Sequence, residues 1–256
     1  MSALPDDAEA RREWLTRWGA EQEQRMREAE RRQMTTLPAR AVARTRAGIA
    51  RIPKQLVGAS ALLADRVLDR ELHTSGGLSL PEHHYSDRLG YEPSAWYVLP
   101  RALWYLGVSD RDTFVDFGCG KGRVVHQAAK RPFRRVIGVE ISPALAEIAR
   151  AAVAARRHQH RCHDVEIVVA DAAEFRVPDD LTIGYFFHPF SGDTLVRVLR
   201  SIVDSLERNP RRVRLIYAVP HAGSLVLATG RFRLVTVHRA LPGDRGYGWA
   251  AIFESC

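Results

Sequence analysis

Strand-like and helical segments alternate along residues 113–219, and this alternation restricts the fold more than any other feature of the sequence. The strand-like segments are short apolar runs at residues 113–117, 135–140, 165–170, 182–187 and 213–219. Helical patterns lie between them, at residues 123–130, 143–157 and 195–206. Strands buried on both faces of a parallel sheet read as nearly continuous apolar runs. The sequence therefore predicts an α/β fold with a doubly wound, mostly parallel sheet.

The alternation ends near the C-terminus. Two strand-like runs, residues 232–238 and 247–253, are joined by the turn-rich stretch 241–246, which leaves no room for a helix between them. Two such runs around a short turn predict an antiparallel hairpin. Together with the five parallel strands, the hairpin predicts a sheet of seven strands.

The first third of the chain has a different character. We predict a helical, basic extension over residues 1–80 and a ligand-binding domain over residues 81–256. No acidic residue lies between positions 31 and 64, whereas Arg31, Lys54 and five arginines between them are basic. One interpretation is a docking arm for nucleic acid or anionic lipid. The favoured interpretation is a solvated helix face, because no aromatic side chains interleave the basic ones.

Composition excludes several classes of protein. No apolar run approaches the roughly 20 residues that a membrane-spanning helix requires, and residues 1–13 lack the apolar core of a secretory signal. Cys119, Cys162 and Cys256 are far apart, so neither a disulfide framework nor a metal site is predicted. We therefore expect a cytoplasmic protein without a membrane span.

A further helix is predicted just before the first strand. Trp96, Leu99, Leu103 and Leu106 are apolar at helical spacing within residues 93–106. Ser94 lies near the expected start of this helix, where its hydroxyl suits a helix N-terminus.

The glycine-rich loop after the first strand is the main candidate binding element. Residues 116–122 read Asp-Phe-Gly-Cys-Gly-Lys-Gly, and the loop opens a helix, so its backbone can approach a ligand closely. A dinucleotide fingerprint would have glycine at its sixth position, where this chain has Arg123. Asp116 places a carboxylate beside the loop, which suits a cationic ligand better than a pyrophosphate. Cys119 is interpreted as a small packing residue.

Two more acids end the next strands. Glu140 ends the second strand, where a carboxylate can accept both hydroxyls of a ribose. Asp171 ends the third, where it can accept the amino group of adenine while the backbone N–H of Ala172 meets a ring nitrogen. The carboxyl ends of parallel strands meet at the crevice where open α/β sheets bind ligands. The three acids together therefore predict a site for a nucleoside.

These residues resemble the motifs of the class I S-adenosylmethionine-dependent methyltransferases over residues 91–256. The resemblance implies a seven-stranded fold and S-adenosylmethionine as the methyl donor. The residues implied in donor binding are Tyr91, Glu92, Ser94, Asp116, Gly118, Cys119, Gly120, Gly122, Glu140, Ile141, Asp171, Ala172 and His188.

A narrower similarity is to the non-SET protein-lysine methyltransferases. In that family a Tyr-Gly-Glu segment before the glycine loop helps to hold the amino acid end of the donor. Tyr91-Glu92-Pro93-Ser94 occupies a similar place here without the glycine.

The acceptor is expected at the end of the fourth strand, where residues 186–190 read Phe-Phe-His-Pro-Phe. Many amino-group methyltransferases carry Asn or Asp, Pro and an aromatic residue here. His188 replaces that polar residue, and it either orients or deprotonates the acceptor or is a loop histidine bonded to backbone. Tyr85, Tyr91, Trp96 and Phe190 are hypothesised to line the reaction mouth, with His188 and Tyr85 as the catalytic candidates.

Three functions fit these motifs. An enzyme that methylates an amine of a protein or a small molecule is favoured, because the donor motifs are complete. The alternatives are an RNA methyltransferase that docks through Arg31 to Lys54, and a non-catalytic scaffold with a methyltransferase fold.

Overall fold

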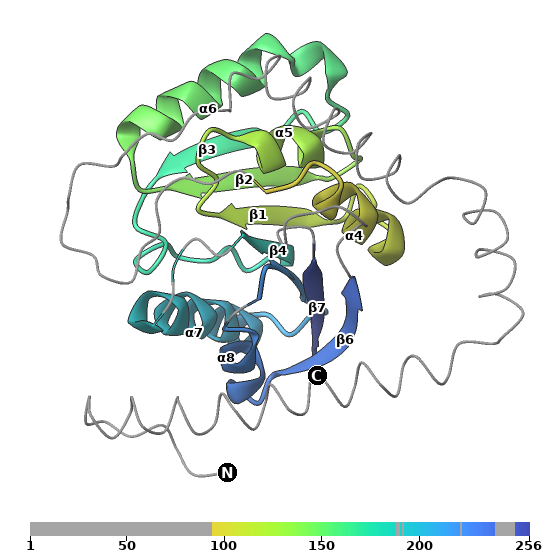
Figure 1. Ribbon diagram of the computed structural model, residues 1–256, viewed down its shortest axis with the longest axis vertical. Helices are drawn as coiled ribbons and strands as arrows, with labels where there is room; N and C mark the ends of the chain where they lie inside the picture. The colour runs from red at the N-terminus through yellow and green to blue at the C-terminus, as the bar shows by residue number, and fades with distance from the viewer. Residues whose placement is uncertain (1–93, 188–189, 191, 221, 239–248) are drawn as a thin grey trace, which may run out of the picture.

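The computed structural model describes residues 94–187, 190, 192–220, 222–238 and 249–256 as one α/β domain of three layers (Figure 1). Several predictions lie outside the described residues: the helical extension over residues 1–80, the basic stretch from Arg31 to Lys54, and the site candidates Tyr85, Tyr91, Glu92 and His188. The predicted domain boundary at residue 81 also stays a prediction.

A seven-stranded sheet forms the middle layer, in the order β3-β2-β1-β4-β5-β7-β6. The first five strands are parallel, and β7 is inserted antiparallel between β5 and β6. The predicted sheet and hairpin are therefore confirmed. The strands are β1 (Thr113–Phe117), β2 (Arg135–Glu140), β3 (Val165–Val169), β4 (Leu181–Phe187), β5 (Arg214–Ala218), β6 (Phe232–His238) and β7 (Ala250–Ser255).

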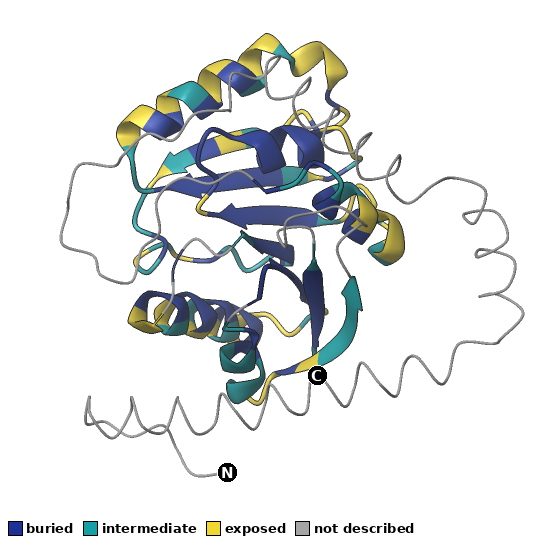
Figure 2. Ribbon diagram, viewed as in Figure 1, coloured by how far each residue is buried: buried dark blue, intermediate teal, exposed yellow. Residues whose placement is uncertain are grey.

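Helices cover both faces of the sheet. On one face lie α4 (Val98–Leu106), α5 (Arg123–Ala129) and α6 (Pro143–Ala155), which is followed by the short η1 (Arg157–Gln159). On the other face lie α7 (Gly192–Arg208) and α8 (Gly223–Ala228). Neighbouring strand residues point to opposite faces, so Phe114 joins one core while Val115 and Phe117 join the other. Figure 2 shows the central strands buried and the outer faces of α6 and α7 exposed.

The start of α4 differs from the prediction. The helix begins at Val98 and not near residue 93, because residues 95–98 form a turn in which the Val98 N–H donates to the Ala95 carbonyl at 3.1 Å. Ser94 and Trp96 precede the helix and are buried. By contrast, Pro143 lies in the first turn of α6 as predicted, with Ser142 as the N-cap that accepts the Leu145 N–H.

The short helix α8 between β5 and β6 was not predicted. Its six residues are too few to show a helical period in the sequence, and only Gly223 and Val226 are buried.

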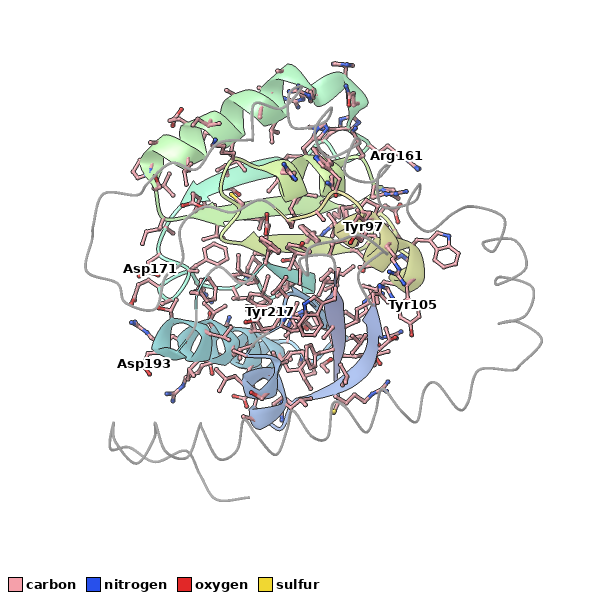
Figure 3. The ribbon with its side chains drawn as sticks, viewed as in Figure 1. Tyr97, Tyr105, Arg161, Asp171, Asp193 and Tyr217 are labelled. Carbon is pink, nitrogen blue, oxygen red and sulfur yellow. The ribbon has the colours of Figure 1, made fainter. Side chains whose placement is uncertain are left out.

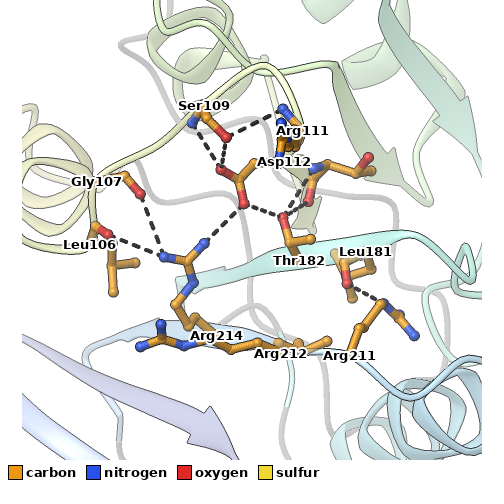
Figure 4. A network of polar contacts seen from close by, with 12 residues as sticks. Leu106, Gly107, Ser109, Arg111, Asp112, Leu181, Thr182, Arg211, Arg212 and Arg214 are labelled. Carbon is orange, nitrogen blue, oxygen red and sulfur yellow. Dashed lines mark hydrogen bonds and ion pairs between the residues drawn. The ribbon is translucent and has the colours of Figure 1, made fainter.

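A polar network fastens the amino edge of the sheet (Figure 4). Asp112 precedes β1, and its Oδ1 accepts from Arg214 Nη2 at 3.0 Å and from Thr182 Oγ1 at 2.9 Å. Arg214 Nη1 donates to the Leu106 carbonyl at 3.2 Å, while the Ser109 N–H donates to the other Asp112 oxygen at 2.9 Å. The network thereby ties the end of α4 to β4 and β5.

Two kinds of feature are absent from the described residues. None of their helices has the length and apolar character needed to cross a bilayer. Nor do they contain a group of three or more His, Cys, Asp or Glu side chains placed to hold a metal ion.

Candidate active site

The glycine loop runs from β1 into α5, and its backbone conformation and close packing disfavour residues that carry a Cβ atom. Gly118, Gly120 and Gly122 have φ values of +83°, +53° and +79°, the left-handed region that glycine adopts without strain. The N–H groups of Gly118 and Cys119 both donate to the Val139 carbonyl at 2.9 Å, which ties the loop to β2. A Cβ on Gly122 would lie 3.0 Å from the Cβ of Ala149, so the loop also packs tightly on α6.

Glu140 closes the other side of the loop. Its Oε2 accepts from the Gly120 N–H at 2.8 Å, and its Oε1 accepts from the Ser142 N–H at 2.9 Å. Burial raises the pKa of Glu140, and hydrogen bonds from the Ser142, Gly120 and Ile141 backbone oppose that rise. Each oxygen of a carboxylate has a second lone pair, so both can still accept from a pair of hydroxyl groups.

Asp116 is the most deeply buried acid of the site, with 2% of its surface exposed. Burial raises its pKa well above the ordinary value, and the nearby charge of Glu140 raises it further. In the described part of the chain no cationic side chain opposes this rise. A buried acid without a counter-ion is costly for the fold, and a cationic ligand would supply that counter-ion.

Asp171 completes the acidic set just beyond β3 (Figure 3). Its Oδ1 accepts the Ala173 N–H at 2.9 Å, and Ala172 beside it is buried. Because β3, β2 and β1 are adjacent in the sheet, Asp171, Glu140 and Asp116 follow one another along its carboxyl edge. The structure thus brings together the three acids that the sequence placed at strand ends.

Cys119 is a packing residue, as its place in the loop suggested. It is buried, and a Cβ added to Gly138 would lie 2.8 Å from its Sγ. Burial first, then the charges of Asp116 and Glu140, raises the pKa of its thiol, so the nucleophilic thiolate is disfavoured.

The expected acceptor side lies at the ends of β4 and β5. Phe117 of β1 pairs in register with Phe186 of β4, so the chain after Phe186 leaves the sheet beside the glycine loop. Phe186 stacks on Phe117 with ring centroids 4.9 Å apart and meets Phe190 edge-on at 6.3 Å. Phe190 is therefore buried, while His188 lies outside the described residues.

Val219 ends β5 with an unusual backbone. Its φ is +49°, which is an outlier for a β-branched residue, and its N–H donates to the Trp249 carbonyl at 3.0 Å. Strained residues of this kind cluster at binding and catalytic sites. The sequence does not predict this strain, because the strain depends on the tertiary structure and not on a local pattern.

Two further residues of the site were not singled out from the sequence. Tyr185 pairs in register with Asp116, and burial raises the pKa of its hydroxyl. Arg123, the first residue of α5, is 4% exposed, and its Nη1 donates to the Ser94 carbonyl at 2.8 Å. The only sequence signal for Arg123 was its position directly after the loop, where the dinucleotide fingerprint requires glycine.

A family model of the methyltransferase domain matches residues 114–209, the part of the chain that contains the glycine loop and all three acids. The chain carries a class I, S-adenosylmethionine-dependent methyltransferase domain. The prediction made from the motifs is thereby confirmed, together with the methyl donor as cosubstrate. The narrower similarity to protein-lysine methyltransferases finds no support in these comparisons.

Solved structures with similar folds come from several organisms. A precorrin 8W decarboxylase from Methanobacterium thermoautotrophicum is 24% identical, with 65% of this chain and 92% of that chain covered and a TM-score of 0.47. A TehB-like methyltransferase from Corynebacterium glutamicum is 17% identical over 62% and 87% of the two chains, with a TM-score of 0.44. A methyltransferase from Aquifex aeolicus is 14% identical over 64% and 93%, with a TM-score of 0.48. No curated protein sequence matches the chain significantly.

The described residues of the methyltransferase site fit this donor. S-adenosylmethionine carries an ammonium and a sulfonium and no phosphate. The buried carboxyl of Asp116, which no described cation opposes, suits such a ligand. Glu140 presents two acceptor oxygens for the ribose, and Asp171 with the Ala172 N–H is placed for adenine. These individual assignments stay predictions.

Proposed function

We propose that this methyltransferase transfers the donor's methyl group to an amine of a protein or a small molecule. The observation that carries the proposal is the acceptor segment, Phe186 to Phe190, which leaves β4 beside the glycine loop. A polar residue, proline and an aromatic residue at this place resemble the acceptor motif of amino-group methyltransferases. The packing of Phe190 on Phe186 supports an apolar wall at the end of β4.

Alignment of the two reactants is the main task left to the protein. Bound S-adenosylmethionine supplies an activated methyl group on a good leaving group, so the transfer is an in-line displacement at carbon. Orientation and exclusion of water can then provide much of the rate. The glycine loop, Glu140 and Asp171 hold the donor at the sheet edge, and the β4 and β5 ends bound the path of the acceptor.

Removal of a proton is the second task. An amine is protonated near neutral pH and must lose its proton before it can attack carbon. We propose His188 as the group that orients the amine or takes this proton, because the pKa of histidine is near neutrality. Tyr85 is proposed as a second polar group near the reacting nitrogen.

The test is a methyl-transfer assay with radiolabelled donor and a panel of acceptors. The panel contains small primary amines, lysine-containing peptides, hydroxylated small molecules and RNA, and the Asp116→Asn variant serves as the donor-binding control. We expect amines to be labelled, at a rate that rises with pH as more free amine becomes available. His188→Ala should lower turnover most near neutral pH, where the amine is largely protonated and needs a base, and unchanged turnover would remove His188 from the mechanism.

Two results would replace the proposal. Labelling of RNA alone, with a steep dependence on salt, would indicate the RNA methyltransferase with a basic docking arm. Donor binding without labelling of any acceptor would favour the non-catalytic scaffold.

A further inference from the structure

The buried guanidinium of Arg123 lies where a helix disfavours a cation. Arg123 is the first residue of α5, and the exposed N–H groups of a helix N-terminus carry a partial positive charge. The side chain is nevertheless buried, with 4% of its surface exposed. Such a placement is costly unless specific contacts compensate it.

Two contacts of Arg123 reach the same short segment before α4. Its Nη1 donates to the Ser94 carbonyl at 2.8 Å, and its guanidinium carbon lies 5.0 Å from the centre of the Trp96 ring. Both distances are within the ranges of a charge-assisted hydrogen bond and a cation–π interaction. Ser94 and Trp96 are themselves buried, so water screens these contacts little.

The segment held by Arg123 lies close to the buried acid of the donor site. Tyr185 pairs in register with Asp116. Burial raises the pKa of the Tyr185 hydroxyl, while a polar contact with the Ser94 side chain and the charge of Arg123 lower it, so Tyr185 lies between the segment held by Arg123 and the strand that carries Asp116. Arg123 itself directly follows the glycine loop.

We propose that Arg123 is a positioning residue for the amino acid end of the donor. It fixes residues 94–96 beside the glycine loop and near Tyr185, which pairs in register with Asp116, the acid that suits the cationic amino acid end of the donor. Arg123 thus acts through residues 94–96 and not through the nucleoside pocket of Glu140 and Asp171. The inference rests on the donor site and is independent of the acceptor.

The two halves of the donor can be tested separately with two ligands. S-adenosylhomocysteine carries both the nucleoside and the amino acid end, whereas 5′-methylthioadenosine lacks the amino acid end. We would measure both dissociation constants by calorimetry for the unaltered protein, Arg123→Met, Arg123→Lys and Trp96→Leu. Arg208→Met is the matched control, because Arg208 also donates to a backbone carbonyl, that of Val177 at 3.3 Å, but on α7.

The expected result is a selective loss. Arg123→Met should weaken binding of S-adenosylhomocysteine about tenfold or more, as loss of one charge-assisted hydrogen bond and its stacking would do. Binding of 5′-methylthioadenosine should change by less than about twofold, since the nucleoside contacts are untouched. Arg123→Lys and Trp96→Leu should show the same selectivity to a smaller degree, and Arg208→Met should show none.

Three results would overturn the inference. Equal weakening of both ligands would indicate general damage to the domain, and unchanged binding of both would show that Arg123 is dispensable. Equal affinity of the unaltered protein for the two ligands would mean that the amino acid end is not held at all. If Arg123→Met does not fold, Arg123→Lys and Trp96→Leu decide by the same criterion. If the protein methylates amines but the variants weaken both ligands equally, only this inference is contradicted. If the variants weaken S-adenosylhomocysteine selectively but no amine is methylated, only the proposed function is contradicted.

Discussion

An aspartate lies at each end of β1, and the two differ in whether a cationic side chain balances their charge. Asp112, before the strand, forms an ion pair with Arg214 at 3.0 Å and accepts three further hydrogen bonds. Asp116, near the other end, has no opposing cation among the described residues, and burial raises its pKa. The amino edge therefore balances its charge to stabilise the fold. At the carboxyl edge no described cation balances Asp116, and a cationic ligand would supply that balance.

The largest expected effect comes from Asp116→Asn. This change removes the charge that would pair with the donor, so binding of S-adenosylmethionine should weaken at least about a hundredfold, in the range found when one partner of a buried charge pair is lost. The measurement is calorimetric titration at pH 7.

The same Asp116→Asn variant should melt higher than the unaltered protein. Because the folded-state pKa of Asp116 is raised, its stabilising effect is complete only below the unfolded value and is lost as pH rises. At pH 7 the acid therefore costs stability, and Asn removes that cost, for a gain of about 3 °C in melting temperature. A lower melting temperature at pH 7 would contradict the account of this edge.

The matching change at the other edge, Asp112→Asn, should do the reverse. It removes the charge opposite Arg214 and turns an amide N–H toward one of the groups that donate to Asp112. We expect a loss of about 2 kcal/mol in the free energy of unfolding, because a largely buried ion pair is broken from one side. Chemical denaturation measures the loss, and the dissociation constant of the donor should stay within about twofold, since the network lies at the far end of β1. If Asp112→Asn weakens donor binding as well as stability, the two edges of the sheet do not have separate roles.

Glu140→Gln tests whether the acid at the end of β2 binds the ribose of the donor. Gln keeps one acceptor oxygen for the Gly120 or Ser142 N–H but loses the second, so adenosine should bind about tenfold more weakly. The comparison of adenosine with 2′-deoxyadenosine decides the cause. In the unaltered protein adenosine should bind better, and in the variant this preference should shrink. A preference that survives intact would mean that Glu140 holds the loop and not the ribose.

The smallest effect is expected at a buried pair outside both edges. His126 Nδ1 lies 2.9 Å from His160 Nε2, and burial, followed by the charges of Lys130, His160 and Arg156, lowers the pKa of His126 to about 3. Stability is therefore complete above the unfolded pKa near 6.5 and is lost as pH falls from there toward 3. His126→Asn, whose amide can still reach His160, should reduce the loss between pH 7 and pH 5 by about 1 kcal/mol. Thermal melts at the two pH values test this, and an equal loss in both proteins would exclude His126 as the cause.

The sequence predicted what depends on chain periodicity and on strand ends. Strand bounds such as those of β1 and β2 agree with the prediction, because buried parallel strands leave continuous apolar runs. Asp116, Glu140 and Asp171 were predicted to meet, since parallel strands bring their carboxyl ends to one edge. The glycine loop and the C-terminal hairpin followed from equally local patterns.

Contacts between distant segments were beyond the sequence. The tie from Arg123 to Ser94 joins residues 29 apart, and it uses the carbonyl of a residue that we expected near a helix start. The positive φ of Val219 lies just after β5, at a residue whose N–H donates to the carbonyl of Trp249, 30 residues later in the chain. Helix α8 was too short to give a period. Such features depend on packing of the whole domain, which a pattern in one segment does not encode.

The most direct test of the central claim is calorimetric titration of the unaltered protein with S-adenosylmethionine, beside NAD, in two buffers that differ in ionisation enthalpy. We expect the methyl donor to bind and NAD not to bind. We also expect a heat that depends on the buffer, because a bound cation should lower the raised pKa of Asp116 and so change the number of protons that the site holds. Binding of NAD in preference to the donor, or no binding of the donor at millimolar concentration, would contradict the central claim.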